Sequence, residues 1–474
     1  MRGLLALLFV AATVAGAAFF ADHPGRVEIV WQGWQVDTSV GVLVGAVALV
    51  GLVLSLLALC GAALRRMPLR VRRRRAARRR RTGEAALTRG IVALAAGQAA
   101  EAERAAQSAA ALLDGAPVAL LLGAEAAARQ GDIAAARGAY TVLLGRPDTE
   151  FLGLRGLIGQ ALRAGDDDGA RHLAERARKL RPDAGWLSDA LLLLAARAGD
   201  WASAEGTLAG AMRHRALPAE RERHHRGIVL YELSLDAERS GDPRRAARLA
   251  ATAQVLAADL AAPACHHARL LIGLGKSRAA ARAIERAWRT APHPDLARLY
   301  LEIDPEAPPL ARAAAMQRLA AHNPEASESH LAVAEAALAA QLWGEARHHL
   351  ALAIAAPSSS GGSFSPGPSR RLCRLMARLE EEESGDMAAA RDWLDRAIGA
   401  PPGPSYLCRQ CGGGDTPEWQ ALCRDCGGFD TLVWRHPPSG DRAVTLDPAS
   451  AGAPLMLPAP QAPGAQGVRP PPRP

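Results

Sequence analysis

Four cysteines near the C-terminal end carry the clearest chemical signal in the sequence. Cys408 and Cys411 form one CxxC motif, Cys423 and Cys426 form a second, and eleven residues lie between them. A glycine follows each motif and permits a tight turn around a sulfur-bound ion. Four thiolates close a tetrahedral shell without leaving an open position. We therefore predict one structural zinc or iron ion at these cysteines.

The predicted metal knuckle covers residues 404–436. A redox-active dithiol is the alternative interpretation, but it gives no reason for the motif to occur twice. We expect Trp419, Phe429 and Trp434 to cover the knuckle, because a segment this short has almost no other core. Its three arginines are too few for a nucleic-acid surface. A structural role and protein docking are the expected uses.

Histidines are the next candidates for chemistry. The run Cys265-His266-His267 lacks a partner cluster, which favours a place in an ordinary repeat helix. His266 or His267 would be the axial ligand if the chain carried haem or a porphyrin.

Two further histidine pairs fall on amphipathic helical patterns, and we expect them to be solvated: His224-His225 and His348-His349. The sequence shows no Ser-His-Asp set, nucleotide-binding fingerprint or convincing acid–base pair. We therefore predict no catalytic residues and no enzyme activity.

The elements that must position these residues are predicted to be helices. Hydrophobic residues make up 49% of the chain but aromatic residues only 4%, and alanine is abundant, which favours close-packed helices over sheets. Glycines recur every 34 residues at Gly97, Gly131, Gly165 and Gly199, and again at Gly241 and Gly275. The same step leads to Pro309 and Trp343, and Gly385 opens a last unit.

Alanine follows five residues after every one of these positions except Trp343, as at Ala170, Ala204 and Ala314. A 34-residue period with glycine ending the first helix of each pair is typical of tetratricopeptide (TPR) repeats. We predict an all-α fold whose repeats stack into a solenoid with a concave groove for protein partners. The predicted parts are repeats at 83–356, a Gly/Ser/Pro linker at 357–369, a last unit at 370–403 and a disordered Pro-rich tail at 437–474.

Two uncharged hydrophobic runs precede the repeats. Leu4–Phe20 has 17 residues and Val40–Leu64 has 25. Runs of this length can cross a bilayer as helices, so residues 1–64 are predicted to form a transmembrane hairpin. A cleaved signal peptide is the alternative for the first run.

An arginine-rich segment at 65–82 follows the second run. It holds eleven arginines between Arg65 and Arg81 and no acidic residue in that stretch. These charges exceed the formal net charge of +9, so the rest of the chain has no excess of basic residues and nucleic acid is not an expected partner. Basic residues stay on the cytoplasmic side, which predicts a multi-pass bacterial inner-membrane protein with cytoplasmic repeats. The arginines are also expected to contact anionic lipid.

The order of these parts resembles the HemY-type membrane proteins associated with haem biosynthesis. The matching residues include Ala21-Asp22, Pro24-Gly25, Val27–Trp31 and Asp37–Ser39, followed by a second helix, an arginine cluster and TPR units. The four-cysteine knuckle looks like that of LapB, a membrane-anchored TPR protein of lipopolysaccharide regulation, although that family has one membrane helix.

The HemY-type resemblance implies a role in the late, membrane-associated part of haem or porphyrin synthesis. The predicted function is a non-catalytic membrane scaffold or regulator whose groove binds proteins, including haem-pathway enzymes. A porphyrin or haem carrier is one alternative. A regulator of envelope lipopolysaccharide synthesis of the LapB kind is the other.

Overall fold

A computed structural model describes residues 25–31, 34–355 and 368–437. It divides into two compact units, residues 1–136 and 137–474, which are described separately. The predicted membrane segment Leu4–Phe20, most of the predicted linker and the Pro-rich tail lie outside the described residues.

The described part of the first unit starts with an antiparallel hairpin of β1 (Arg26–Trp31) and β2 (Trp34–Ser39). No strand was predicted within the transmembrane hairpin at residues 1–64. The two strands form because valine, isoleucine, threonine and tryptophan are concentrated there, and these residues favour extended backbone. This small sheet is the first addition to the predicted all-α fold.

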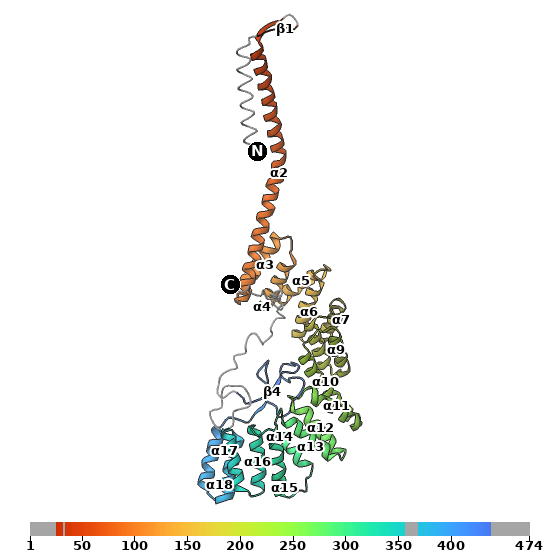
Figure 1. The fold of residues 1–474 in the computed structure, drawn as a ribbon, viewed down its shortest axis with the longest axis vertical. Coiled ribbons are helices and arrows are strands. Elements are labelled where there is room, and N and C mark those ends of the chain that lie inside the picture. The colour runs from red at the N-terminus through yellow and green to blue at the C-terminus, as the bar shows by residue number, and fades with distance from the viewer. Residues whose placement is uncertain (1–24, 32–33, 356–367, 438–474) are drawn as a thin grey trace, which may run out of the picture. The chain divides into compact units, whose positions relative to one another are not determined.

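A single helix, α2 (Val40–Ala95), follows the hairpin and runs for 56 residues (Figure 1). It contains Val40–Cys60, the segment within the described residues that is long and apolar enough to cross a membrane. The same helix continues through the arginine-rich segment. Its C-terminal part packs against α3 (Ala99–Leu112) and α4 (Pro117–Gln130), with Ala86, Ala109 and Ala119 in the contact.

The second unit is a stack of helices in sequence order, which Figure 1 shows from α6 onward. The boundary falls within α5 (Ile133–Leu144). The following helices are α6 (Glu150–Ala164), α7 (Asp167–Leu180), α8 (Gly185–Arg197), α9 (Trp201–His214), α10 (Ala219–Arg239), α11 (Pro243–Leu256), α12 (Ala261–Gly273), α13 (Ser277–Trp288), α14 (Pro294–Glu302), α15 (Pro309–Ala320), α16 (Ser327–Ala339), α17 (Trp343–Ala355), α18 (Arg370–Ser384) and α19 (Met387–Gly399).

The recurring Gly-Asp pairs end one helix and begin the next. Gly165, Gly199 and Gly241 have left-handed backbone angles, with φ of 74°, 68° and 78°. A residue without Cβ adopts this conformation at little cost. The aspartate that follows then caps the next helix, as Asp200 accepts a hydrogen bond from the backbone N–H of Ser203. The predicted helix ends at these glycines are confirmed.

The predicted alanine positions lie between the paired helices through most of the array. Ala170 and Ala204 are fully buried, so the helix backbones can approach closely. The register was wrong in the middle of the array. Pro309 begins α15 instead of ending a helix, and the buried alanine there is Ala313 rather than Ala314. Farther on, Gln341 takes the left-handed conformation, with φ of 58°.

Candidate metal centre

The two CxxC motifs are brought together by a short antiparallel sheet, β3 (Ser405–Cys408) and β4 (Leu432–Arg435). Cys408 ends β3 opposite Leu432. Gly414 has a φ of 90°, and a Cβ there would approach the Leu432 side chain to 3.0 Å. Glycine is therefore required for the chain to turn back tightly beside the sulfurs.

The four cysteine sulfurs form one cluster and lie within 4.8 Å of one another. Cys408 Sγ lies 3.7 Å from Cys426 Sγ, and Cys411 Sγ lies 3.7 Å from Cys423 Sγ. A tetrahedral ion with metal–sulfur bonds of about 2.3 Å separates its ligands by about 3.8 Å. The cluster therefore has the size that such an ion requires, and it can hold one.

Backbone groups of the first turn point at the cluster. The N–H groups of Gln410 and Cys411 lie 3.3 and 3.4 Å from Cys408 Sγ. Burial opposes ionisation of Cys408, but hydrogen bonds from Thr431 and the Cys411 backbone lower its pKa to about 6. A thiolate is the form that binds metal, so this turn favours the binding-competent state of Cys408.

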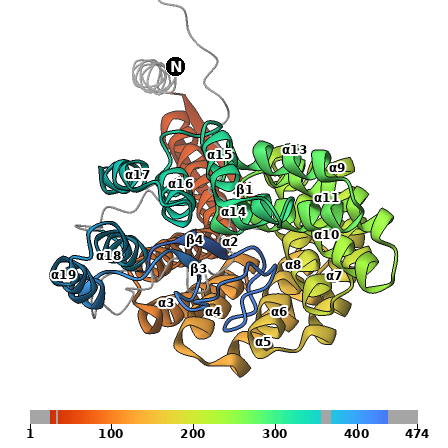
Figure 2. The ribbon, with the colours of Figure 1, turned by 90° about the horizontal axis from the view of Figure 1, so that it is seen from below.

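The knuckle is not a separate folded segment, because it packs against the repeat helices. Figure 2 shows β3 and β4 inside the curve of helices that includes α8, α10, α14 and α16. Buried residues of the knuckle and of α8–α10 form one apolar cluster, which includes Leu192, Ile228, Tyr406, Trp419 and Leu432. Of the three aromatic residues predicted to cover the knuckle, Trp419 is the most deeply buried, at 5% exposed.

Aromatic side chains join the knuckle to two repeat helices. Trp419 meets Tyr231 of α10 edge-on, with ring centroids 5.8 Å apart. The ring centroid of Trp434 lies 4.3 Å from that of His293, which comes just before α14. Tyr406 stacks on the same histidine. Burial lowers the pKa of His293 to about 4, so this imidazole is neutral where the aromatic rings enclose it.

An ionic contact fixes the other edge of the knuckle. Asp430 Oδ2 lies 3.2 Å from His224 Nε2 and 3.6 Å from His225 Nε2, and His224 Nδ1 lies 3.0 Å from Asp259. Hydrogen bonds to Asp259 and Asp430 raise the pKa of His224 to about 10. Burial opposes the charge of Asp430, yet hydrogen bonds from both histidines lower its pKa to about 2.

The expectation that His224 and His225 are solvated was therefore wrong. Their side chains are 23% and 13% exposed. Adjacent histidines on a helix gave no signal of this contact, because their partner Asp430 lies about 200 residues away in the chain. Arg197 adds a further link by donating to the Gly427 carbonyl at 3.4 Å while pairing with Asp167.

A cavity of about 1150 Å³ lies between the knuckle and helices α8, α10 and α11. Its lining includes Asp189, Arg223, His224, Val255 and Arg409. Burial raises the pKa of Asp189, whose Oδ1 atom lacks a hydrogen-bond partner. The cavity is thus a recess lined by both charged and apolar side chains, and it lies on the inner side of the helical curve in Figure 2.

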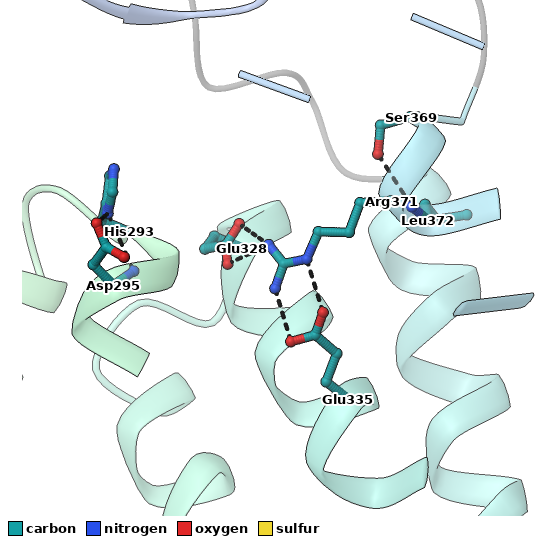
Figure 3. A network of polar contacts seen from close by, with 7 residues as sticks. All are labelled: His293, Asp295, Glu328, Glu335, Ser369, Arg371 and Leu372. Atoms are coloured by element: carbon teal, nitrogen blue, oxygen red, sulfur yellow. Dashed lines mark hydrogen bonds and ion pairs between the residues drawn. The ribbon is translucent and has the colours of Figure 1, made fainter. Parts of the chain in front are cut away.

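A partly buried ion network holds the last unit near His293, the histidine that the knuckle's aromatic rings contact. In Figure 3, Glu328 and Glu335 of α16 flank the guanidinium of Arg371 on α18, with His293 and Asp295 nearby. Arg371 Nη1 lies 2.8 Å from Glu328, and its Nε lies 2.8 Å from Glu335. Burial raises the pKa of Glu328 despite the charge of Arg371. The network holds α18, the helix that follows the predicted linker, against α16.

The histidines considered as haem ligands lie in α12 and contact other repeat helices. His266 is 1% exposed, and its Nε2 lies 2.9 Å from the Ser234 hydroxyl. His267 Nδ1 lies 2.8 Å from Gln254 Oε1. Burial lowers the pKa of both imidazoles to about 4. These contacts agree with their predicted place in a repeat helix.

The N-terminal part matches a known protein family, and most of the chain is similar to one curated protein. Residues 25–131 match the family described as "HemY protein N-terminus". A protein of Magnetospirillum gryphiswaldense described as "Probable magnetosome protein Mms48" is 28% identical over 430 residues, which are 87% of this chain and 88% of that protein.

Solved structures that are similar to this chain have lower sequence identity to it. The structure titled "Structure of Naa15/Naa10 bound to HypK-THB" is 18% identical with a TM-score of 0.38 and covers 67% of this chain, which spans 50% of that chain. A tetratricopeptide repeat protein from Parabacteroides merdae is 12% identical with a TM-score of 0.32, covering 67% of this chain and 99% of its own. The family match over residues 25–131 confirms the predicted HemY-type resemblance of the N-terminal part. The chain combines an apolar helix long enough to cross a membrane with stacked helical repeats and a four-cysteine cluster.

Proposed function

We propose that this protein is a non-catalytic scaffold of the bacterial inner membrane that holds protein partners on the inner face of its repeats. The cavity between the knuckle and helices α8, α10 and α11 carries this proposal, because it offers charged groups and the exposed Val255 side chain on one concave surface. Helical-repeat solenoids use such surfaces to hold extended segments of other proteins.

The proposal includes one structural zinc or iron ion at Cys408, Cys411, Cys423 and Cys426. The sulfur spacing and the donated backbone N–H groups support this assignment. The ion supplies folding free energy to a segment with little core of its own, and thereby keeps one wall of the cavity in place.

The proposed orientation is multi-pass with cytoplasmic repeats, supported by the arginines that follow Val40–Cys60. The proposed pathway is late haem or porphyrin synthesis, supported by the match to the HemY N-terminus. The partners would then be membrane-associated enzymes of that pathway, and anionic lipid would contact the arginine segment.

Partner capture with two matched variants of the full chain tests the proposal. Val255→Asp places a charge on the cavity wall, where Val255 is 57% exposed. Leu310→Asp makes the same change on α15, where Leu310 is 65% exposed and does not line the cavity. Both side chains are exposed, so neither change removes core packing.

After cross-linking in membranes and purification, mass spectrometry should find the same partners with the wild type and Leu310→Asp, and fewer with Val255→Asp. Equal partner sets for both variants would exclude the cavity as the binding surface. A partner set without porphyrin-synthesis enzymes would remove the haem link but leave the scaffold role. Titration of the purified chain with haem addresses the carrier alternative through the absorbance of a ligated histidine.

A further inference from the structure

Two histidines outside the knuckle, on α16 and α17, bring potential metal-binding nitrogens close together. His330 of α16 and His349 of α17 face each other, with their Nδ1 atoms 3.1 Å apart and ring centroids at 5.3 Å. Without an ion, only one proton can occupy the space between these two nitrogens. The other nitrogen must then present a lone pair.

The far side of His349 is held by a carboxylate. Its Nε2 lies 3.3 Å from Glu345 Oε1, and Glu345 accepts a hydrogen bond of 2.9 Å from the Gln317 side chain on α15. A metal-bound histidine commonly donates its second N–H to a carboxylate that is itself hydrogen-bonded. This arrangement places the proton on Nε2 and leaves Nδ1 of His349 free to bind an ion facing His330.

The spacing of the two nitrogens fits one ion. Metal–nitrogen bonds of about 2.0–2.1 Å separate neighbouring ligands by about 2.9 Å at right angles and by about 3.4 Å in a tetrahedron. The observed 3.1 Å lies between these values. Both side chains are partly buried, while the adjacent His348 is exposed, so the site lies at the edge of the packed helices with access to solvent.

We propose that His330 and His349 bind one divalent transition-metal ion of the nickel, copper or zinc type, with Glu345 as the positioning residue. Water completes the coordination shell. Imidazole ligands favour these ions over magnesium and calcium, which prefer oxygen. The site joins α16 to α17 and is separate in ligands and chemistry from the four-cysteine cluster.

The test uses the tag-free full chain in detergent, with the knuckle saturated with zinc and excess zinc removed. Calorimetric titration with Ni²⁺ should show one site in the wild type. His330→Gln and His349→Gln should each abolish it, and Glu345→Gln should weaken it about 10–100-fold. His348→Gln, which alters the exposed neighbour, should bind Ni²⁺ like the wild type. Helical circular dichroism should be unchanged in all variants.

A second measurement counts the ligands directly. One equivalent of Cu²⁺ should give an electron paramagnetic resonance spectrum with coupling to two imidazole nitrogens, reduced to one in either ligand variant. Absence of a Ni²⁺ site in the wild type would overturn the proposal, as would a site that survives in His330→Gln and His349→Gln. Loss of binding in His348→Gln would also overturn the assigned ligand pair.

Discussion

In the repeat array each helix packs against its neighbours in the chain, whereas the knuckle packs against helices far away in sequence. Tyr406 contacts His293 across 113 positions, and Arg197 reaches Gly427 across 230. The array spreads its stability over many similar contacts. The knuckle depends on one proposed ion and one docking surface, so a single change can remove either. Four experiments can separate these two kinds of stability.

The largest effect is expected from Cys411→Ser. Structural zinc contributes about 10–16 kcal/mol to small domains, so loss of one ligand should unfold the knuckle. The array should remain helical because its contacts are among its own helices. Metal analysis and tryptophan fluorescence would report on the knuckle, where Trp419 and Trp434 lie, and circular dichroism on the array. A knuckle that stays folded without metal would contradict the prediction.

Overpacking the array should have a smaller, local effect. Ala204 on α9 is fully buried, so Ala204→Leu should lower the free energy of unfolding by about 3 kcal/mol. Ala209→Leu adds the same atoms at an exposed position of the same helix and should be nearly neutral. Thermal unfolding followed by circular dichroism compares them. Equal melting temperatures for both variants would mean that the α9 packing is wrong.

Removing the ionic link should loosen the knuckle without unfolding it. Asp430→Asn keeps the side-chain shape but removes the charge facing His224 and His225, which should weaken docking by about 2 kcal/mol. Asp415→Asn changes an exposed carboxyl of the same knuckle and serves as the control. Hydrogen exchange of the knuckle amides gives the comparison. Unchanged protection in Asp430→Asn would show that the apolar cluster alone holds the knuckle.

A change of pH should have the smallest effect on the ionic contact of Asp430 with His224 and His225. His224 has a pKa raised from 6.5 to about 10, so its contribution is complete below pH 6.5 and is lost as pH rises toward 10. Asp430 has a pKa lowered from 3.8 to about 2, so its contribution is lost only as pH falls below 4. Knuckle protection, corrected for intrinsic exchange, should therefore decrease from pH 6.5 to 9. His224→Gln should make the profile flatter, and a wild-type profile that is already flat would contradict the assigned charge.

The sequence predicted what depends on local patterns. The 34-residue glycine spacing located helix ends because a left-handed residue is needed wherever a helix stops and turns back. The clustering of the four cysteines was predicted because the spacing within each CxxC pair is a local pattern. The partners of His224, His225 and His330 were missed because contacts between distant helices leave no periodic trace. The register error at Pro309 arose where α14 shortens to nine residues and the repeat length changes.

The continuous helix α2 has a mechanical consequence. It joins the apolar segment Val40–Cys60 to the residues that pack against α3 without an intervening loop, over a length of about 84 Å at 1.5 Å per residue. A helix is stiff to torsion, since twisting it strains every backbone hydrogen bond. Rotation of the apolar segment about its own axis would therefore rotate the C-terminal part of α2, and α3 packed against it, by the same angle. A flexible linker in place of this helix would not transmit the rotation.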